Sequence, residues 1–332
     1  MANPPDPTLP TIADFRAAAE RLTGHAVRTP LLSSPILDER AGGRILMKCE
    51  NLQRTGSFKF RGAYNAIAAI SRAARERGVV AVSSGNHGQG VAEAARLFGV
   101  HATIVMPADA PRIKRRRTER SGGRVVEYDR GREDREAVAA RTIAEHGGTL
   151  IHPYDNANVI AGQGTVGLEV VADCAAAGIS PAAIVIPCGG GGLAAGVGLA
   201  VRDAWPATAI TLVEPEGFDD YGRSLRQGRI VANAAAAGSV CDALLAPSPG
   251  RIGFAINRDN RAEAITVGDE AALAAVAFAF DELKLVVEPG GAVALAAILS
   301  GKLDGRGRTI VVVLSGGNIE DSVLARAFES RG

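Results

Sequence analysis

The chain has 332 residues, of which 47% are hydrophobic, 4% are aromatic and 22% are charged, and its formal net charge is +1. A chain of this length has room for about two domains and buries a large core without disulfides or a structural metal. Near-zero net charge and scarce aromatic residues argue against a nucleic-acid or membrane partner, because such partners need a positive field or exposed stacking surfaces.

The first residues, MANPPDPTLPT, are rich in proline and lack the basic start and apolar core of a signal peptide. The four cysteines at positions 49, 174, 188 and 241 have neither the spacing of a zinc site nor that of a disulfide framework. We therefore expect reduced, buried cysteines and a cytoplasmic protein.

The first segment that carries chemistry is SFKFRGA, which starts at Ser57. Apolar residues from Ala63 to Ile70 recur at helical spacing, which predicts a helix that begins near Ser57. Lys59 then lies in the first turn, where the positive end of the helix disfavours its charge and lowers the pKa of its amine. A lowered pKa suits a lysine that acts as a nucleophile and base. Taken alone, the motif fits an ordinary solvated lysine better.

A repeated unit follows, in which a short apolar strand leads into a glycine-rich turn and then a helix. Apolar strands that alternate with helices indicate a parallel sheet covered on both faces. Glycines at the carboxyl ends of such strands predict a ligand cleft at that edge of the sheet. The expected strands are 79–83, 101–106, 124–128, 183–186, 209–214 and 309–314.

At the first of these turns, Ser83, Ser84, Asn86 and His87 stand at the predicted start of a helix. Small polar side chains and free backbone N–H groups in that place can hold a carboxylate, and the Asn86 amide can bind a ring oxygen. A hydrogen-bonded helix cap explains the same residues equally well.

The stretch from Ala110 to Arg141 is charged, whereas the second half of the chain is apolar and rich in glycine. This contrast indicates a smaller, mobile domain in the first half. The basic run KRRRTER, residues 114–120, is best explained as a solvated helix face.

The second turn is PCGGGGLAAG, residues 187–196, where four glycines separate a strand from a helix. Such a loop forms a nest of N–H donors suited to a phosphate monoester. A tight turn that permits close packing is an equal alternative, and the loop matches neither a Walker A motif nor a clean GxGxxG. Residues 182–201 carry no charge, but Pro187 and the glycines favour strand, loop and helix over a membrane span.

Two further segments are ambiguous by themselves. In the third turn, SGGN, the hydroxyl of Ser315 can bind a heterocycle nitrogen, although an ordinary turn is the simpler explanation. The acidic segment from Glu214 to Asp220 follows a strand and fits a turn with helix-capping acids.

Together and in this order, SFKFRGA, SSGNHGQ, GGGGL and SGGN resemble the fold type II pyridoxal-phosphate enzymes, from about Thr11 to Asn318. The resemblance is to the threonine/serine dehydratase and serine racemase branch, which includes 3-hydroxyaspartate dehydratases. It implies a tryptophan synthase β-like α/β fold with two parallel-type twisted sheets flanked by helices. Residues 1–52 and 148–332 would form a large cofactor-binding domain, residues 53–147 a small mobile one, and two chains a homodimer.

The resemblance also assigns roles to matching residues. Lys59 would bind the aldehyde of pyridoxal 5'-phosphate. The remaining cofactor contacts would be Phe58 under the ring, Asn86 at the ring hydroxyl, Ser315 at the pyridine nitrogen, and Gly189, Gly190, Gly191, Gly192 and the N–H of Leu193 at the phosphate. The substrate carboxylate would be received by Ser83, Ser84, Asn86 and His87.

The expected reaction removes water and then ammonia from L-threonine, L-serine or 3-hydroxyaspartate. The substrate amine displaces Lys59, the freed lysine removes the α-proton, the β-hydroxyl leaves, and hydrolysis gives a 2-oxo acid and ammonia. A neutral serine at the pyridine nitrogen favours this elimination over transamination.

Further residues are assigned by resemblance alone. Ser84 resembles the opposite-face acid/base of serine racemases and permits a racemase activity. Arg135 would pair with a second substrate carboxylate, although a surface arginine is the simpler interpretation. Glu214, Asp220 and the carbonyl of Phe218 resemble a divalent-cation site for Mg²⁺, Ca²⁺ or Mn²⁺.

Several alternatives stay open. An amino-acid racemase built on the same site is the nearest, and a β-replacement synthase fits the motifs less well. A nucleotide-binding protein and a non-catalytic cofactor-binding protein are rivals of other classes. Because the chain ends soon after SGGN, we expect no C-terminal regulatory domain.

Overall fold

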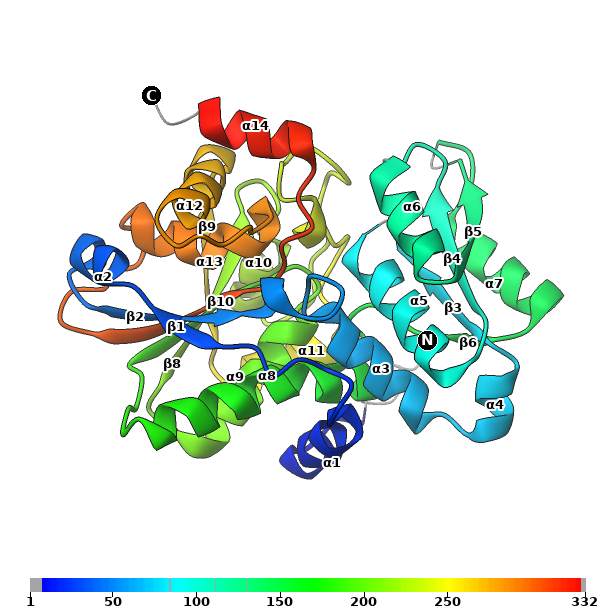
Figure 1. Ribbon diagram of the computed structural model, residues 1–332, viewed down its shortest axis with the longest axis horizontal. Helices are drawn as coiled ribbons and strands as arrows, with labels where there is room; N and C mark the ends of the chain where they lie inside the picture. Colours follow the sequence, from blue (N-terminus) through cyan, green and yellow to red (C-terminus); the bar gives the residue numbers. More distant parts are fainter. Residues whose placement is uncertain (1–7, 84, 111, 130, 330–332) are drawn as a thin grey trace.

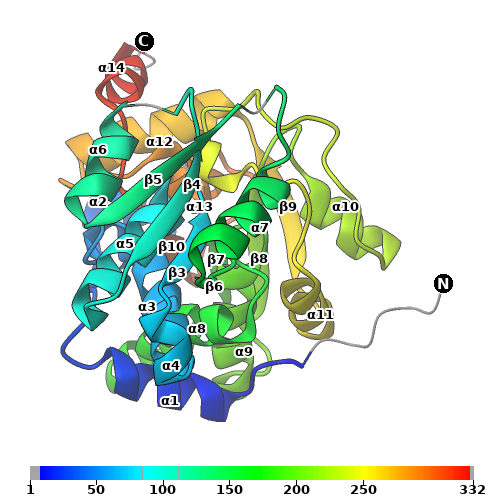
Figure 2. The ribbon, with the colours of Figure 1, turned by 90° about the vertical axis from the view of Figure 1, so that its right-hand side faces the viewer.

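The structure is a computed structural model that describes residues 8–83, 85–110, 112–129 and 131–329. Two sheets stand side by side, each flanked by helices (Figures 1 and 2). The larger sheet has the strand order β1-β2-β10-β7-β8-β9, and every neighbouring pair is parallel except β1 with β2. Its strands are β1 (Leu31–Ser33), β2 (Arg44–Cys49), β7 (Ala183–Pro187), β8 (Ala209–Pro215), β9 (Glu263–Val267) and β10 (Thr309–Leu314).

Helices cover both faces of this sheet, which explains why its central strands are apolar throughout. Val185 and Val312 point to one face and pack with α12 and α13, whereas Ile184 and Val311 point to the other and pack with α8 and α9. The helices associated with this sheet are α2 (Pro35–Ala41), α8 (Ala157–Ala176), α9 (Gly192–Ala204), α10 (Asp220–Gln227), α11 (Arg251–Asp259), α12 (Asp269–Asp281), α13 (Pro289–Leu299) and α14 (Asp321–Glu329).

The smaller sheet is wholly parallel and has the strand order β5-β4-β3-β6. Helices α5 and α6 lie on one side of it and α7 lies on the other (Figure 2). Its elements are β3 (Val79–Val82), α5 (Asn86–Phe98), β4 (Ala102–Pro107), α6 (Arg112–Arg120), β5 (Gly123–Tyr128), α7 (Arg135–His146) and β6 (Thr149–Leu150). Strand β6 completes this sheet, although the predicted boundary at residue 147 placed it in the large domain.

Helix α3 (Lys59–Ala69) connects the two halves, because it packs against α8 on one side and α5 on the other. The helices α3 and α8 touch at glycines: a Cβ on Gly162 would lie 2.5 Å from the carbonyl oxygen of Arg61. The remaining elements are α1 (Ile12–Leu22), η1 (Glu50–Leu52), α4 (Arg72–Glu76) and η2 (Asp242–Leu244). Among the described helices, α8 alone has the length and composition of a membrane span, and its packing accounts for its apolar character.

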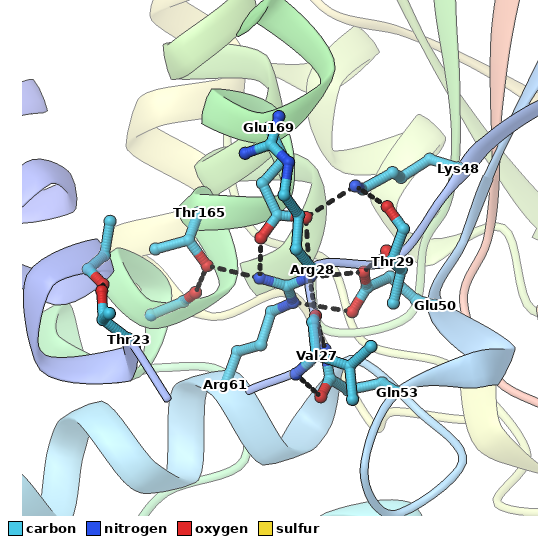
Figure 3. Close-up of polar contacts among 12 residues, drawn as sticks. Thr23, Val27, Arg28, Thr29, Lys48, Glu50, Gln53, Arg61, Thr165 and Glu169 are labelled. Carbon is cyan, nitrogen blue, oxygen red and sulfur yellow. Dashed lines mark hydrogen bonds and ion pairs between the residues drawn. The ribbon is translucent and has the colours of Figure 1, made fainter. Parts of the chain in front are cut away.

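A buried cluster of charges anchors the first turn of α3 (Figure 3). The guanidinium of Arg61 donates to both oxygens of Glu50 at 2.8 Å and to Glu169 of α8 at 2.7 and 3.0 Å. Lys48 of β2 donates to Glu169 at 2.6 Å. Arg61 is 1% exposed and Glu50 is 0% exposed. Because Arg61 is two residues beyond Lys59, this cluster fixes the helix end that carries Lys59.

Candidate active site

A cavity of about 570 Å³ lies where the carboxyl ends of strands from both sheets meet. The three glycine-rich turns found in the sequence all contribute to its wall. Gly85 and Asn86 come from the first turn, the four glycines 189–192 from the second, and Ser315 and Asn318 from the third. The ligand cleft that the glycine pattern predicted is therefore present at this edge.

Lys59 lines the cavity as the first residue of α3. Its amine donates to the carbonyl oxygen of Pro153 at 2.8 Å and lies 5.1 Å from the centre of the Phe58 ring. Burial lowers the pKa of Lys59 to about 8. The pKa of Lys59 is therefore lowered, as the sequence predicted. The cause is the loss of hydration of the buried amine rather than the helix end.

This lowered pKa predicts how fast the free protein captures an aldehyde. The neutral amine is the nucleophile, and it predominates above pH 8 instead of above the ordinary lysine value of 10.5. We expect the rate of pyridoxal-phosphate attachment to the apoprotein to rise with pH through a midpoint near 8, followed by absorbance. N-acetyl-lysine methyl amide is the matched control, with its midpoint at the ordinary lysine value of 10.5. A midpoint for the protein equal to that of this control would contradict the lowered pKa of Lys59.

The tetraglycine turn forms part of the cavity wall, and aromatic side chains pack tightly against it. A Cβ on Gly190 would lie 2.3 Å from the ring of Tyr154, and one on Gly191 would lie 2.2 Å from the ring of Tyr221. Gly191 also has a φ of +85°, a conformation that favours glycine. Gly192 and Leu193 begin α9, so their backbone N–H groups have no partners within the helix.

The start of α5 also lines the cavity. The Ser83 hydroxyl accepts a hydrogen bond at 3.1 Å from the N–H of Gly85, the residue before α5, but no side chain caps this helix; Ser84 lies outside the described residues. Nε2 of His87 donates to the carbonyl oxygen of Ile151 at 2.7 Å, and burial lowers the pKa of His87 to about 3. The imidazole is therefore neutral, and His87 would meet a carboxylate through its backbone N–H at the helix start.

Ser315 and Phe58 lie side by side at the base of the cavity. The N–H of Phe58 donates to the carbonyl oxygen of Ser315 at 3.2 Å, and Ser57 forms a β-bridge with Gly316. Ser315 is 5% exposed and lines the cavity together with Phe58. These contacts join the segment before Lys59 to the end of β10.

Arg135, the first residue of α7, lies at the rim and lines the cavity together with Glu136. Its Nε is 3.4 Å from a carboxylate oxygen of Glu136, and its side chain is 44% exposed. His152 and Tyr154 line the same region with their rings packed edge to face, 4.7 Å between centroids. Sequence reasoning missed both of these residues because the segment that carries them contains no glycine-rich turn.

The basic run on α6 is more than a solvated face. Lys114 forms ion pairs with Asp242 and Glu320, both of which belong to segments of the larger half. Arg117, one turn further on, donates to Asn318 at 3.2 Å. Lys114 and Arg117 therefore face the larger half across the cavity. The sequence pattern alone could not show this, because their partners are distant in the chain.

The acidic segment after β8 lies behind the tetraglycine turn. Glu214, 0% exposed, accepts from the N–H groups of Tyr221 and Gly222 at 2.8 Å each, so the helix-capping interpretation is confirmed for this residue. Asp220 accepts from Asn233 at 2.6 Å, while its Oδ2 is buried without a partner among the described residues. Burial raises the pKa of Glu214 to about 8 and that of Asp220 to about 6.

No cluster of three or more His, Cys, Asp or Glu side chains in the described part of the chain is arranged to hold a metal ion. Phe218, the third predicted ligand, is 5% exposed in the turn between β8 and α10. Of the three predicted cation ligands, Glu214 therefore caps α10 and Asp220 has one carboxylate oxygen without a partner among the described residues. The third is the backbone carbonyl of Phe218.

The cavity fits a phosphorylated aldehyde. The glycine turn lines the cavity with backbone that carries no side chains, and Lys59 places a weakly basic amine in the same cavity. Pyridoxal phosphate, when bound, supplies an electron sink for the electron pair left by a departing α-proton. Gly189 to Leu193 would hold its phosphate and Ser315 its ring nitrogen.

The chain's own groups define the remaining chemistry. In its neutral form, the Lys59 amine can take a proton, and the start of α5 can bind a carboxylate through N–H groups. A small amino acid whose α-carbon lies near Lys59 is the class of substrate that this arrangement serves.

A family model for the pyridoxal-phosphate dependent enzymes matches residues 22–316, so the chain belongs to that family. An L-threo-3-hydroxyaspartate ammonia-lyase from Pseudomonas sp is 44% identical over 92% of this chain and 95% of its own length. Among solved structures, threonine deaminase from T.th. is 44% identical, with a TM-score of 0.88 over 94% of this chain and 99% of its own. Maize serine racemase is 35% identical, with a TM-score of 0.90 over 97% and 98%.

These findings confirm the predicted family, the fold type II α/β architecture and a pyridoxal-phosphate-dependent lyase of the dehydratase type. They decide against the nucleotide-binding alternative. The racemase alternative is no better supported than the dehydratase. The roles of individual site residues stay predictions, although the described ones, apart from the three of the cation set, all line one cavity.

Proposed function

We propose that this protein is an ammonia-lyase that converts a β-hydroxy amino acid to a 2-oxo acid and ammonia, with 3-hydroxyaspartate as the preferred substrate class. The observation that carries the proposal is that the Lys59 amine and the tetraglycine turn line the same cavity. The amine would remove the α-proton, and loss of the β-hydroxyl would follow.

A second carboxylate on the substrate is suggested by the charges at the rim. Arg135 lines the cavity and is free enough, at 44% exposure, to turn from Glu136 toward a ligand. A guanidinium binds a carboxylate through two parallel hydrogen bonds, which selects a dicarboxylic substrate over threonine or serine. The relative that is named for 3-hydroxyaspartate supports the same choice.

A divalent cation is a further part of the proposal. Asp220 has a buried oxygen without a partner in the described residues, and its charge, after burial, helps to raise the pKa of the neighbouring Glu214. Mg²⁺, Ca²⁺ or Mn²⁺ would relieve this repulsion with oxygen ligands and water. Because Tyr221 contacts both Glu214 and Gly191, the ion would stiffen the phosphate turn.

We also propose that the protein works as a cytoplasmic homodimer without nucleic-acid or membrane partners. The near-neutral charge supports the absence of nucleic-acid and membrane partners, and the four buried, free cysteines support the cytoplasmic location.

The test is a substrate panel scored for 2-oxo acid and ammonia, with and without chelator. It contains L-threonine, L-serine, both L-3-hydroxyaspartate diastereomers and, as controls, L-aspartate and L-alanine. We expect kcat/KM for one hydroxyaspartate to exceed that for L-serine by about 10-fold or more. We also expect Arg135→Met to remove this preference while L-serine turnover persists, and the chelator to lower activity and thermal stability together. Chiral analysis of remaining substrate detects the racemase alternative, and the absence of 2-oxo acid from every substrate would refute the proposal.

A further inference from the structure

The side-chain amide of Asn86 is held from both sides by residues of the larger half. Its Nδ2 donates to Oε1 of Glu288 at 2.6 Å, and its Oδ1 accepts from Nδ2 of Asn318 at 2.7 Å. Asn86 begins α5 beside the smaller sheet, Glu288 immediately precedes α13, and Asn318 follows β10. A primary amide has two N–H groups and two lone pairs, so within the described residues Asn86 keeps one of each for a ligand.

Asn318 is itself held in a single orientation. Its second N–H donates to the carbonyl oxygen of Thr55 at 2.8 Å, and its Oδ1 accepts from Arg117 at 3.2 Å. A Cβ on Gly56 would lie 2.7 Å from that Oδ1, so the glycine is needed for this approach. Rotating the Asn318 amide by half a turn would replace three hydrogen bonds by contacts between like groups.

Glu288 is equally constrained. It is 5% exposed, and its backbone N–H donates to the carbonyl oxygen of Gly316 at 3.0 Å. A Cβ on Gly316 would lie 2.1 Å from Oε1 of Glu288, so this oxygen packs closely against the glycine-rich turn after β10. In its ionised form Glu288 can only accept hydrogen bonds, which directs the N–H side of the Asn86 amide toward it; burial raises the pKa of Glu288 to about 7.

We propose that Glu288 and Asn318 are positioning residues that clamp the Asn86 amide, present its free N–H to the ring oxygen of the cofactor, and thereby tie the smaller half to the larger one. The inference rests on the proposed function and adds to it two residues that no resemblance assigned. All three side chains line the cavity. The clamp makes binding of the ring depend on the relative position of the two halves.

The experiment measures pyridoxal-phosphate affinity by absorbance and fluorescence titration of the apoprotein, with thermal unfolding of the same samples. The variants are Glu288→Leu and Asn318→Ala, which remove the clamp, and Glu288→Gln, which keeps an acceptor oxygen. Asn318→Asp keeps the shape but places an acceptor against Oδ1 of Asn86. Asn260→Ala is the matched control, because Asn260 is 6% exposed and is not part of the cavity wall.

We expect Glu288→Leu, Asn318→Ala and Asn318→Asp to weaken cofactor binding by about 10-fold or more, and Glu288→Gln by less than about 3-fold. The apoproteins should unfold close to the Asn260→Ala control, and in the loaded enzymes KM should change less than kcat. Rescue by glutamine distinguishes positioning from mere packing. Unchanged affinity in Glu288→Leu and Asn318→Asp would overturn the clamp, whereas a wild-type protein that binds no cofactor would overturn the proposed function as well.

Discussion

Replacing Lys59 with alanine is expected to abolish covalent attachment of pyridoxal phosphate and to lower kcat by on the order of 10³-fold or more. Lys59 is the one lysine of the five in the sequence that lines the cavity with a lowered pKa. No neighbouring amine can replace it, since Lys114 is engaged with Asp242 and Glu320. Turnover is measured as 2-oxo acid release.

Attachment is measured by borohydride reduction and mass analysis of the peptide that contains residue 59. Lys302→Ala is the matched control, because Lys302 is 53% exposed and pairs only loosely with Glu216, at 3.7 Å. Reduced cofactor on the Lys59 peptide of wild type and control, and on no peptide of Lys59→Ala, is the expected pattern. A Lys59→Ala protein that still forms the yellow adduct would show that another amine does the chemistry.

Replacing Arg61 with methionine is expected to lower the free energy of unfolding by about 3–5 kcal/mol, because it leaves buried carboxylates without their counterion. Although burial by itself acts in the opposite direction, the charge of Arg61 keeps the pKa of Glu50 below its ordinary value. Arg61→Lys should recover part of the loss, since a single ammonium group cannot make the paired hydrogen bonds of a guanidinium. Urea unfolding at neutral pH gives the comparison.

Arg72→Met is the control for Arg61, because Arg72 pairs with Glu76 on the surface of α4 and is 86% exposed. We expect this exposed pair to contribute less than about 1 kcal/mol. Since Arg61 anchors the turn that carries Lys59, the Arg61→Met protein that stays folded should also bind pyridoxal phosphate more weakly. Equal stability of the two variants would mean that the charge cluster does not hold α3 in place.

The local sequence pattern was sufficient to predict several strands of the larger sheet and the three glycine-rich turns. The apolar runs at 183–186 and 309–314 became β7 and β10 nearly residue for residue, because each is buried on both faces and bounded by glycine. β2 was missed because Arg44 and Lys48 interrupt its apolar residues, yet Lys48 is 0% exposed. Its charge is matched by Glu169 of α8, which is 121 residues away in the chain.

What the sequence by itself determined is the set of short motifs in which residue type and spacing already define the chemistry: Lys59 at a helix start, the tetraglycine turn, and the polar turn around Asn86. Only the tertiary structure decided how these motifs are held. The partners of Asn86 lie 202 and 232 residues away, and burial rather than the helix end lowers the pKa of Lys59. The physical reason is that hydrogen-bond partnership and loss of hydration depend on which distant segments pack together, whereas a turn or a helix start is specified by its own few residues.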